Sequence, residues 1–253
     1  MSGHSKWSQI KRKKGVADVK KGAMFTRLGR EITLAAREGG GDPNSNFTLR
    51  LAIDKARGAN MPKENIERAI KRGMGELEGG HLDDVMYEGY GSGGAALLVQ
   101  VLTDNRNRAA SDLRHIFSRT GGNLASSNAV AWMFEKKGVV AIEASGNTDD
   151  LALTLIDAGA DDVKVDGNTI EAYVAPEQLK GLRDELEKRK IAIASAELAW
   201  ISKTPAQVSD EQAVSTMKLM EELEEYDDVQ KVYSNLDIND AVIAKYENVK
   251  MAA

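Results

Sequence analysis

The order of periodic segments in residues 139–201 constrains the fold more tightly than any other feature of this sequence. Four short apolar runs predict strands, and two longer segments have apolar residues at helical spacing. In chain order these are strand 139–142, helix 149–158, strands 162–165 and 169–174, helix 176–189 and strand 191–201. Asp166, Gly167 and Asn168 predict a hairpin turn between the two middle strands. The order β-α-β-β-α-β predicts a ferredoxin-like domain.

The first 76 residues predict helices and no strand. Apolar residues follow helical spacing at 18–38, in a second helix that includes 49–56, and in a third that begins near Pro62. The glycines at 39–41 end the first helix, because glycine readily adopts the left-handed conformation that follows a helix. Proline suits the first turn of a helix, where its missing N–H costs nothing. Three short amphipathic helices with a shared apolar interior predict a small helical domain.

Between these two regions the sequence predicts a sheet that a later segment completes. In chain order the expected elements are a turn-rich lead-in at 85–94, a strand at 95–102, a helix at 108–120, a strand at 130–134 and a polar crossing at 135–138. After Thr204 and Pro205 the sequence predicts a helix that starts near Ser209 and a strand at 226–234. That last pair completes no fold alone, so we expect it to return to this sheet.

These elements predict an α+β protein with three domains. The expected boundaries are 1–76 for the helical domain, 77–134 with 206–240 for a discontinuous α/β domain, 135–205 for the inserted ferredoxin-like domain, and 241–253 for a short helical or frayed tail.

Gly89, Gly91 and Gly94 formally match the G-x-G-x-x-G pattern of dinucleotide-binding loops. That interpretation needs a strand before the glycines and a helix after them. A strand, 95–102, follows them instead, so we reject the dinucleotide interpretation and predict no cofactor.

The two ends of the chain differ sharply in charge. Residues 1–76 contain 9 Lys and 8 Arg against 8 acidic residues, a net charge of +9, whereas the whole chain carries −5. The remainder therefore carries −14. A long basic region joined to an acidic body indicates binding of a polyanion, although a solvated basic face would give the same count.

Residues 3–17 have no strong period, and we expect an extended or partly ordered arm. Lysine and arginine in such an arm neutralise phosphates and release counterions, which gives salt-dependent and sequence-tolerant affinity. Trp7 has two interpretations: it stacks on an unpaired base, or it is a core residue that fixes the arm to the helices.

We predict a nucleic-acid-binding surface made of the arm and the basic face of the helices. Its expected residues are Lys6, Trp7, Lys11, Arg12, Lys13, Lys14, Lys20, Lys21, Arg27, Arg30, Arg50, Arg57, Lys71, Arg72, Arg106 and Arg108. Arg106 and Arg108 lie where a strand meets a helix, a place that often holds anions. Local pairing with Asp104 or Asp112 is the other interpretation of these two arginines.

The acidic run at 221–228 has three interpretations. A solvated face is the most common role of such a run. It could also repel nucleic acid from the body and orient the basic region. A cation site is the third, disfavoured because the run lacks the alternating oxygen-ligand spacing of a calcium loop.

Other classes of function find little support. The chain has no cysteine, and His4, His81 and His115 have no metal-ligand spacing, so we predict no metal site. No serine lies in a nucleophile-elbow pattern, and we predict no catalytic residue, no enzyme activity and no small-molecule substrate. No apolar run is long enough for a membrane helix, and no secretory signal is visible, so we expect a cytoplasmic protein without membrane partners.

Several long motifs occur in order along nearly the whole chain. They are Gly3–Trp7, Phe25–Leu28, Arg30–Thr33, Ala36–Pro43, Asn60–Gly73, Tyr87–Gly91, Thr103–Arg108, Gly121–Leu124 and Asp227–Asn235. In these motifs the sequence resembles the YebC/PmpR family. It departs from the family at Lys11–Lys14, where we would expect a histidine, but the positive charge is kept. The resemblance also implies an inserted ferredoxin-like domain.

Proteins similar to this chain are described as transcriptional regulators that bind DNA, and others as translation factors at the ribosome, including a mitochondrial translational activator. The resemblance implies a nucleic-acid-binding regulatory protein, with DNA-binding transcriptional regulation as the first hypothesis. A ribosome-associated translation factor that binds RNA is the alternative, and a protein-interaction scaffold is a second alternative. The sequence shows no helix-turn-helix with dimer spacing, while a basic arm with a tryptophan suits structured RNA.

Overall fold

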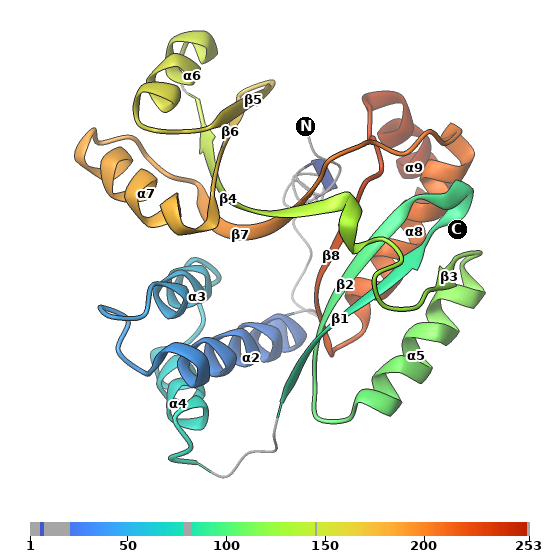
Figure 1. Ribbon diagram of the computed structural model, residues 1–253, viewed down its shortest axis with the longest axis horizontal. Coiled ribbons are helices and arrows are strands. Elements are labelled where there is room, and N and C mark those ends of the chain that lie inside the picture. The colour runs from blue at the N-terminus through green and yellow to red at the C-terminus, as the bar shows by residue number, and fades with distance from the viewer. Residues whose placement is uncertain (1–5, 8–20, 78–81, 145, 252–253) are drawn as a thin grey trace. The chain divides into compact units, whose positions relative to one another are not determined.

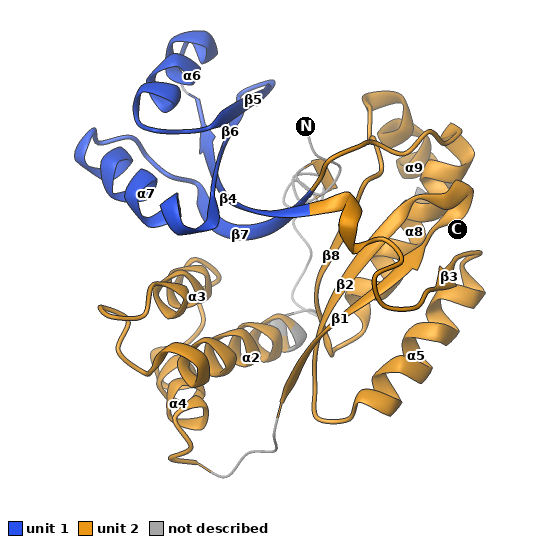
Figure 2. Ribbon diagram, in the orientation of Figure 1, with its two compact units in different colours: residues 1, 135–201 blue, residues 2–134, 202–253 orange. Residues whose placement is uncertain are grey.

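The computed structural model describes residues 6–7, 21–77, 82–144 and 146–251 (Figure 1). The chain divides into two compact units, one of residues 135–201 and one of residues 2–134 and 202–253 (Figure 2). The helices of the basic region and the first sheet belong to the same unit, and the second sheet belongs to the other.

Residues 21–76 of the basic region form three helices around a small core. They are α2 (Lys21–Gly39), α3 (Phe47–Gly58) and α4 (Lys63–Gly73). The apolar stripes predicted from helical spacing are confirmed, because their members are buried together. The buried residues of this core are Leu28, Ile32, Ala35, Ala36, Leu49, Ala52, Ile53, Ala56, Met61, Ile66 and Ala69.

Two local features set how these helices meet. Asn46 caps α3, where its side chain accepts the N–H of Leu49 at 3.0 Å and donates to Ala35 O, near the end of α2, at 2.7 Å. At the end of α4, a Cβ on Gly73 would lie 2.4 Å from the Thr33 carbonyl oxygen of α2. Glycine is therefore required for the close approach of α4 to α2.

The first sheet has strand order β3-β1-β2-β8. The strands are β1 (Asp83–Tyr90), β2 (Ala96–Thr103), β3 (Asn123–Leu124) and β8 (Val229–Ser234), and every pairing is antiparallel. Helices α5 (Arg106–Arg119) and α8 (Asp210–Glu225) contribute to one core with Leu97, Val99 and Val101, which alternate along one face of β2. The pairing of β8 with β2 brings the C-terminal segment back to this sheet.

The sequence expectations miss three features of the unit that contains this sheet. Residues 85–94 were expected as a lead-in, but β1 is a full strand, and its Gly89 has no room for a Cβ beside the Phe117 ring. The strand predicted at 130–134 is wrong, because residues 131–133 form a short 3-10 helix. The tail is helical, one of its two expected forms, as α9 (Asp240–Met251), but it was not expected to contribute Val242 and Tyr246 to the core.

The unit of residues 135–201, blue in Figure 2, has the predicted β-α-β-β-α-β order. Its elements are β4 (Phe134–Glu143), α6 (Thr148–Asp157), β5 (Asp162–Asp166), β6 (Thr169–Val174), α7 (Leu179–Lys188) and β7 (Ser195–Ser202). The strand order β5-β6-β4-β7 places the first and third strands at the centre, as in the ferredoxin-like plan. Residues 135–138 are not a crossing; they belong to β4, where Glu135 and Lys136 face solvent.

The predicted α+β fold is therefore confirmed, with a helical N-terminal region and two antiparallel sheets. The finer division into three domains with the stated boundaries stays a prediction. None of the helices in the described ranges is both long and apolar enough to cross a membrane.

Candidate nucleic-acid interface

The structure describes only Lys6 and Trp7 of the basic arm. Lys11, Arg12, Lys13, Lys14 and Lys20 lie outside the described residues, and the side chain of Lys21 is likewise not described. Lys6 Nζ pairs with Asp240 Oδ1 of α9 at 3.1 Å. Lys6 of the arm therefore lies next to α9.

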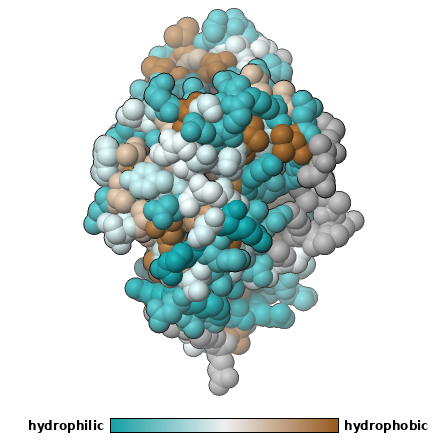
Figure 3. Space-filling model, turned by 90° about the vertical axis from the view of Figure 1, so that its right-hand side faces the viewer, coloured by the Kyte–Doolittle hydropathy of each residue, from teal (hydrophilic) through white to brown (hydrophobic). Residues whose placement is uncertain are grey.

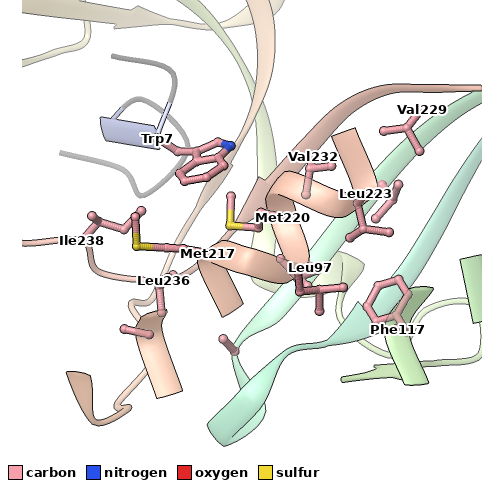
Figure 4. Close-up of a cluster of buried hydrophobic side chains, with 14 of the residues drawn as sticks. Trp7, Leu97, Phe117, Met217, Met220, Leu223, Val229, Val232, Leu236 and Ile238 are labelled. Atoms are coloured by element: carbon pink, nitrogen blue, oxygen red, sulfur yellow. The ribbon is translucent and has the colours of Figure 1, made fainter. Parts of the chain in front are cut away.

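Trp7 is a core residue. Only 1% of it is exposed, and it belongs to the same buried cluster as Met217 and Met220 of α8 (Figure 4). Its ring meets that of Tyr246 edge to face, with the centroids 5.8 Å apart, and its indole N–H donates to Glu224 Oε1 at 3.0 Å. Of the two interpretations of Trp7, the structure supports the core anchor, because a ring buried on both faces offers none to a base.

Two predicted arginines of α2 contact the acidic run at the C-terminal end of α8. Arg27 donates to the backbone carbonyl of Glu224, and its Nε is buried without a hydrogen-bond partner among the described residues. Burial lowers the pKa of Arg27, although the charges of Glu224 and Asp227 oppose this. Arg30 Nη1 donates to the Asp227 carbonyl at 2.8 Å and to Asp228 Oδ1 at 2.8 Å.

Asp228 is the centre of this contact, and only 3% of it is exposed. Besides Arg30, it accepts at Oδ2 from Arg108 Nη2 and from Thr103 Oγ1, each at 2.8 Å. We call these four residues the Asp228 junction. Burial raises the pKa of Asp228, but hydrogen bonds from Arg108 and Thr103 and the charge of Arg30 lower it more, so the pKa lies below its ordinary value. The junction joins α2, β2, α5 and the start of β8.

The arginines at the start of α5 pair with carboxylates of the fold, as the second of their two interpretations predicts. Arg106 Nη2 donates to Asp83 Oδ1 at 2.9 Å, and Arg108 Nη2 also donates to Asp104 Oδ1 at 2.8 Å. The hydrogen bond to Asp83 raises the pKa of Arg106, and hydrogen bonds with Asp228, then Tyr226 and Asp104, raise the pKa of Arg108. Asp112 was an expected partner, but it accepts a hydrogen bond from Tyr226 instead, at 2.8 Å.

The acidic run at 221–228 is more than a solvated face. Glu221 accepts a hydrogen bond from Tyr246 at 2.5 Å and pairs with Lys250, so it fixes α9 to α8. Burial, followed by the hydrogen bond to Glu221, raises the pKa of Tyr246. With the contacts of Glu224 and Asp228 described above, this run holds together segments that are far apart in the sequence.

The remaining predicted cations lie on the helical region itself. Arg50 donates to the carbonyl oxygens of Pro43 and Asn44 at 3.0 and 3.2 Å, which fixes the loop before α3. Arg57 is 71% exposed, with Asp54 at 3.9 Å. Lys71 and Arg72 are exposed, and neither forms an ion pair with any residue in the described ranges.

One side of α4, together with α2, lines a groove of about 400 Å³. Its lining residues, which define what we call the α2–α4 groove, are Phe25, Thr26, Gly29, Arg30, Met61, Asn65, Arg68, Ala69 and Arg72. Sequence reasoning missed Asn65 and Arg68. The signal was present, because Asn65, Arg68 and Arg72 recur at helical spacing beside the apolar stripe of Ile66 and Ala69.

No cluster of three or more histidine, aspartate or glutamate side chains placed to hold a metal ion occurs in the described part of the chain. The cationic side chains described above fall into two groups. Those of the Asp228 junction are neutralised within the fold, and those of α4 face solvent.

Two family models match most of the chain. One, described as the TACO1/YebC protein N-terminal domain, matches residues 5–76, and the other, the TACO1/YebC second and third domain, matches residues 82–236. The chain belongs to the TACO1/YebC family. The resemblance found in the sequence motifs is thereby confirmed.

Two relatives match this chain over nearly the whole of both sequences. A probable transcriptional regulatory protein of Dehalococcoides mccartyi is 50% identical over 98% of this chain and 99% of its own. One from Chloroflexus aurantiacus is 50% identical over 98% of this chain and 100% of its own. The crystal structure of a conserved hypothetical protein from Aquifex aeolicus superposes with a TM-score of 0.82 at 43% identity, and the match covers 88% of this chain and 93% of that one.

Proposed function

We propose that this chain is a nucleic-acid-binding regulatory protein, with DNA-binding transcriptional regulation as its first candidate role. The observation that carries the proposal is the outer surface of α4, where Arg68, Lys71 and Arg72 are exposed and form no ion pair with the described residues. These cations belong to a region with net charge +9, which attracts a polyanion.

The charge order along α4 supports phosphate contacts over base reading. A DNA-reading helix of the helix-turn-helix type contacts base edges with its N-terminal residues. In α4 that end carries Glu64, Glu67 and Lys63, which pairs with Glu67, while Arg68, Lys71 and Arg72 follow in the C-terminal half. Cations there also complement the helix dipole, which stabilises the helix without any ligand. We expect sequence-tolerant binding that depends strongly on salt.

The names of the relatives support the transcriptional role. The proteins from Dehalococcoides mccartyi and Chloroflexus aurantiacus are both named probable transcriptional regulatory proteins, and they align with this chain nearly from end to end.

The test is charge reversal in the arm. Replacing Lys11, Arg12, Lys13 and Lys14 with glutamate should remove most of the affinity for duplex DNA. The slope of log K against log salt should flatten by about 0.9 for each lost phosphate contact. A suitable control is Lys180→Glu with Lys188→Glu, two exposed lysines of α7 in the other compact unit. Unchanged binding by the arm variant would show that the arm is not the contact surface.

A translational role uses the same surface. The placement of Arg68, Lys71 and Arg72 in the C-terminal half of α4 favours a partner recognised by shape and phosphates, as structured RNA is. Co-sedimentation with ribosomes in the presence of excess duplex DNA separates the two roles. Protein that pellets with ribosomes despite the DNA supports translation, and protein that DNA releases into the supernatant supports transcription.

A protein-interaction scaffold is the least supported candidate. Large exposed apolar patches are the usual sign of such a role. On the face that Figure 3 shows, hydrophilic residues predominate and the hydrophobic ones form separated spots over the described residues.

A further inference from the structure

We propose that the α2–α4 groove binds one unpaired nucleotide of a nucleic-acid strand, with Arg68 and Arg72 on its phosphates. This inference rests on the proposed function and deepens it, because it names the site and the form of nucleic acid that the site takes. The groove combines three features that together match a nucleotide: exposed cations, an apolar floor and an amide side chain.

The cations supply the phosphate contact. Arg68 and Arg72 are four residues apart on α4, so they lie on the same side of the helix. Both are exposed, and neither forms an ion pair with any described residue. An arginine guanidinium presents a planar set of donors that matches a phosphate. Arg30 also lines the groove, but the Asp228 junction holds its guanidinium.

The floor is what distinguishes a nucleotide from a bare phosphate. Met61 and Ala69 are buried beneath the groove, and Phe25 is a partly exposed aromatic residue at its side. A phosphate gains nothing from such a surface. A base does, because bases stack on aromatic side chains once they are unpaired. Asn65 adds an amide that donates and accepts hydrogen bonds at a base edge.

Gly29 keeps the floor open. It lies in the interior of α2, where glycine costs about 1 kcal/mol relative to alanine, and it does not need to be glycine for packing. A Cβ added there would meet only the Met61 Cε atom, at an ordinary 3.8 Å. Core packing therefore does not require glycine at this position, and the absence of a side chain leaves space in the groove that Gly29 lines.

The size of the groove fits a single nucleotide. Its volume of about 400 Å³ lies at the lower end of the range of small-ligand sites, roughly 300–1,000 Å³. A base pair in a duplex cannot enter such a groove, because its bases are stacked and paired. We therefore expect a preference for single strands over a duplex of the same sequence.

The test uses fluorescence anisotropy of the full-length protein with short fluorescein-labelled single strands of DNA and RNA, and with the matching duplex. Arg68→Ala with Arg72→Ala should weaken single-strand binding at least tenfold. The salt slope should fall by about 1.4, or 0.7 for each phosphate contact in a single strand. Lys180→Ala with Lys188→Ala, which removes two exposed charges from α7, should bind as the wild type does.

A second variant tests the floor without changing any charge. Gly29→Leu should fill the groove and weaken single-strand binding about tenfold while leaving the salt slope unchanged. Its circular dichroism and thermal unfolding should match the wild type or show a modest gain from the added helix propensity. A correctly folded Gly29→Leu protein with unchanged affinity would overturn the nucleotide site.

The outcomes separate this inference from the proposed function. If the wild type binds single strands and the arginine variant binds as tightly as the α7 control, the groove inference fails and the proposed function stands. If the wild type binds neither strands nor duplex, the proposed function fails. If polyglutamate binds as tightly as the single strand and loses affinity in the same variants, the occupant is an acidic protein segment and the nucleotide is overturned.

Discussion

Two groups of arginines in the same helical region have opposite surroundings. On α2, Arg27 and Arg30 donate to the segment 224–228 and are partly buried there. On α4, Arg68 and Arg72 are exposed and form no ion pair with the described residues. Charge counting treats the two groups alike. The comparison teaches that some cations of a basic region form contacts within its own fold, while others stay exposed to a partner.

The largest effect that tests this contrast is expected at Trp7. Trp7→Ala should lower the free energy of unfolding by about 3–5 kcal/mol, because it removes a fully buried ring and leaves a cavity. Urea denaturation followed by circular dichroism measures the change. If stability holds while nucleic-acid affinity falls, Trp7 would contact a base, and the arm would belong with the exposed group.

Asp228→Ala should have the next largest effect, a loss of about 2–3 kcal/mol. The substitution leaves the partly buried Arg30 without its carboxylate, and removing one partner of a buried pair is costly. Asp237→Ala is the matched control, since Asp237 is exposed in the same unit. Equal stability of the two variants in chemical denaturation would show that the Asp228 junction does not hold the fold.

Gly73→Ala tests the packing beneath the exposed group and should cost about 1–3 kcal/mol. The new Cβ would collide with the Thr33 carbonyl oxygen and the Ala36 Cβ, so α4 must move away from α2. Gly22→Ala in α2, which has open space around it, should instead be neutral or stabilising. Thermal unfolding of both proteins gives the comparison, and a tolerated Gly73→Ala would mean that the helices approach less closely than described.

The pH dependence of the Asp228 junction should be the smallest effect. The pKa of Asp228 is below its ordinary value in the folded chain, so its contribution is fully present above the unfolded pKa. It is lost as pH falls through the folded pKa. The stability difference between the wild type and Asp228→Ala should therefore be largest near neutral pH and shrink below about pH 4. A difference that grows on acidification would contradict the lowered pKa.

Local periodicity was enough to predict much of this fold. The stripes of α2, α3 and α4 and the β-α-β-β-α-β order of residues 139–201 follow from spacing and turn residues that need no knowledge of distant contacts. Strand β1 was hidden because Gly89 and Gly91 resemble a turn. The Phe117 ring and the Asn123 carbonyl oxygen, which pack against Gly89, explain the glycine there.

The candidate site depended on contacts that periodicity cannot show. Arg30 and Asp228 are 198 residues apart in the sequence, so no local pattern reveals that they pair. The same holds for Trp7, whose partner Glu224 is 217 residues away. Arg68 could have been predicted from its spacing to Arg72, but the groove between them and α2 requires the packed helices.

The most direct test of the central claim compares one arginine from each group in otherwise matched variants. Arg27→Met and Arg72→Met remove one guanidinium each and keep an unbranched side chain. We predict that Arg72→Met weakens nucleic-acid binding and lowers the salt slope while stability is unchanged. Arg27→Met should reduce the free energy of unfolding and leave the affinity of the folded protein unchanged. The opposite pattern, or the same loss of affinity in both variants, would contradict the division of these arginines between fold and partner.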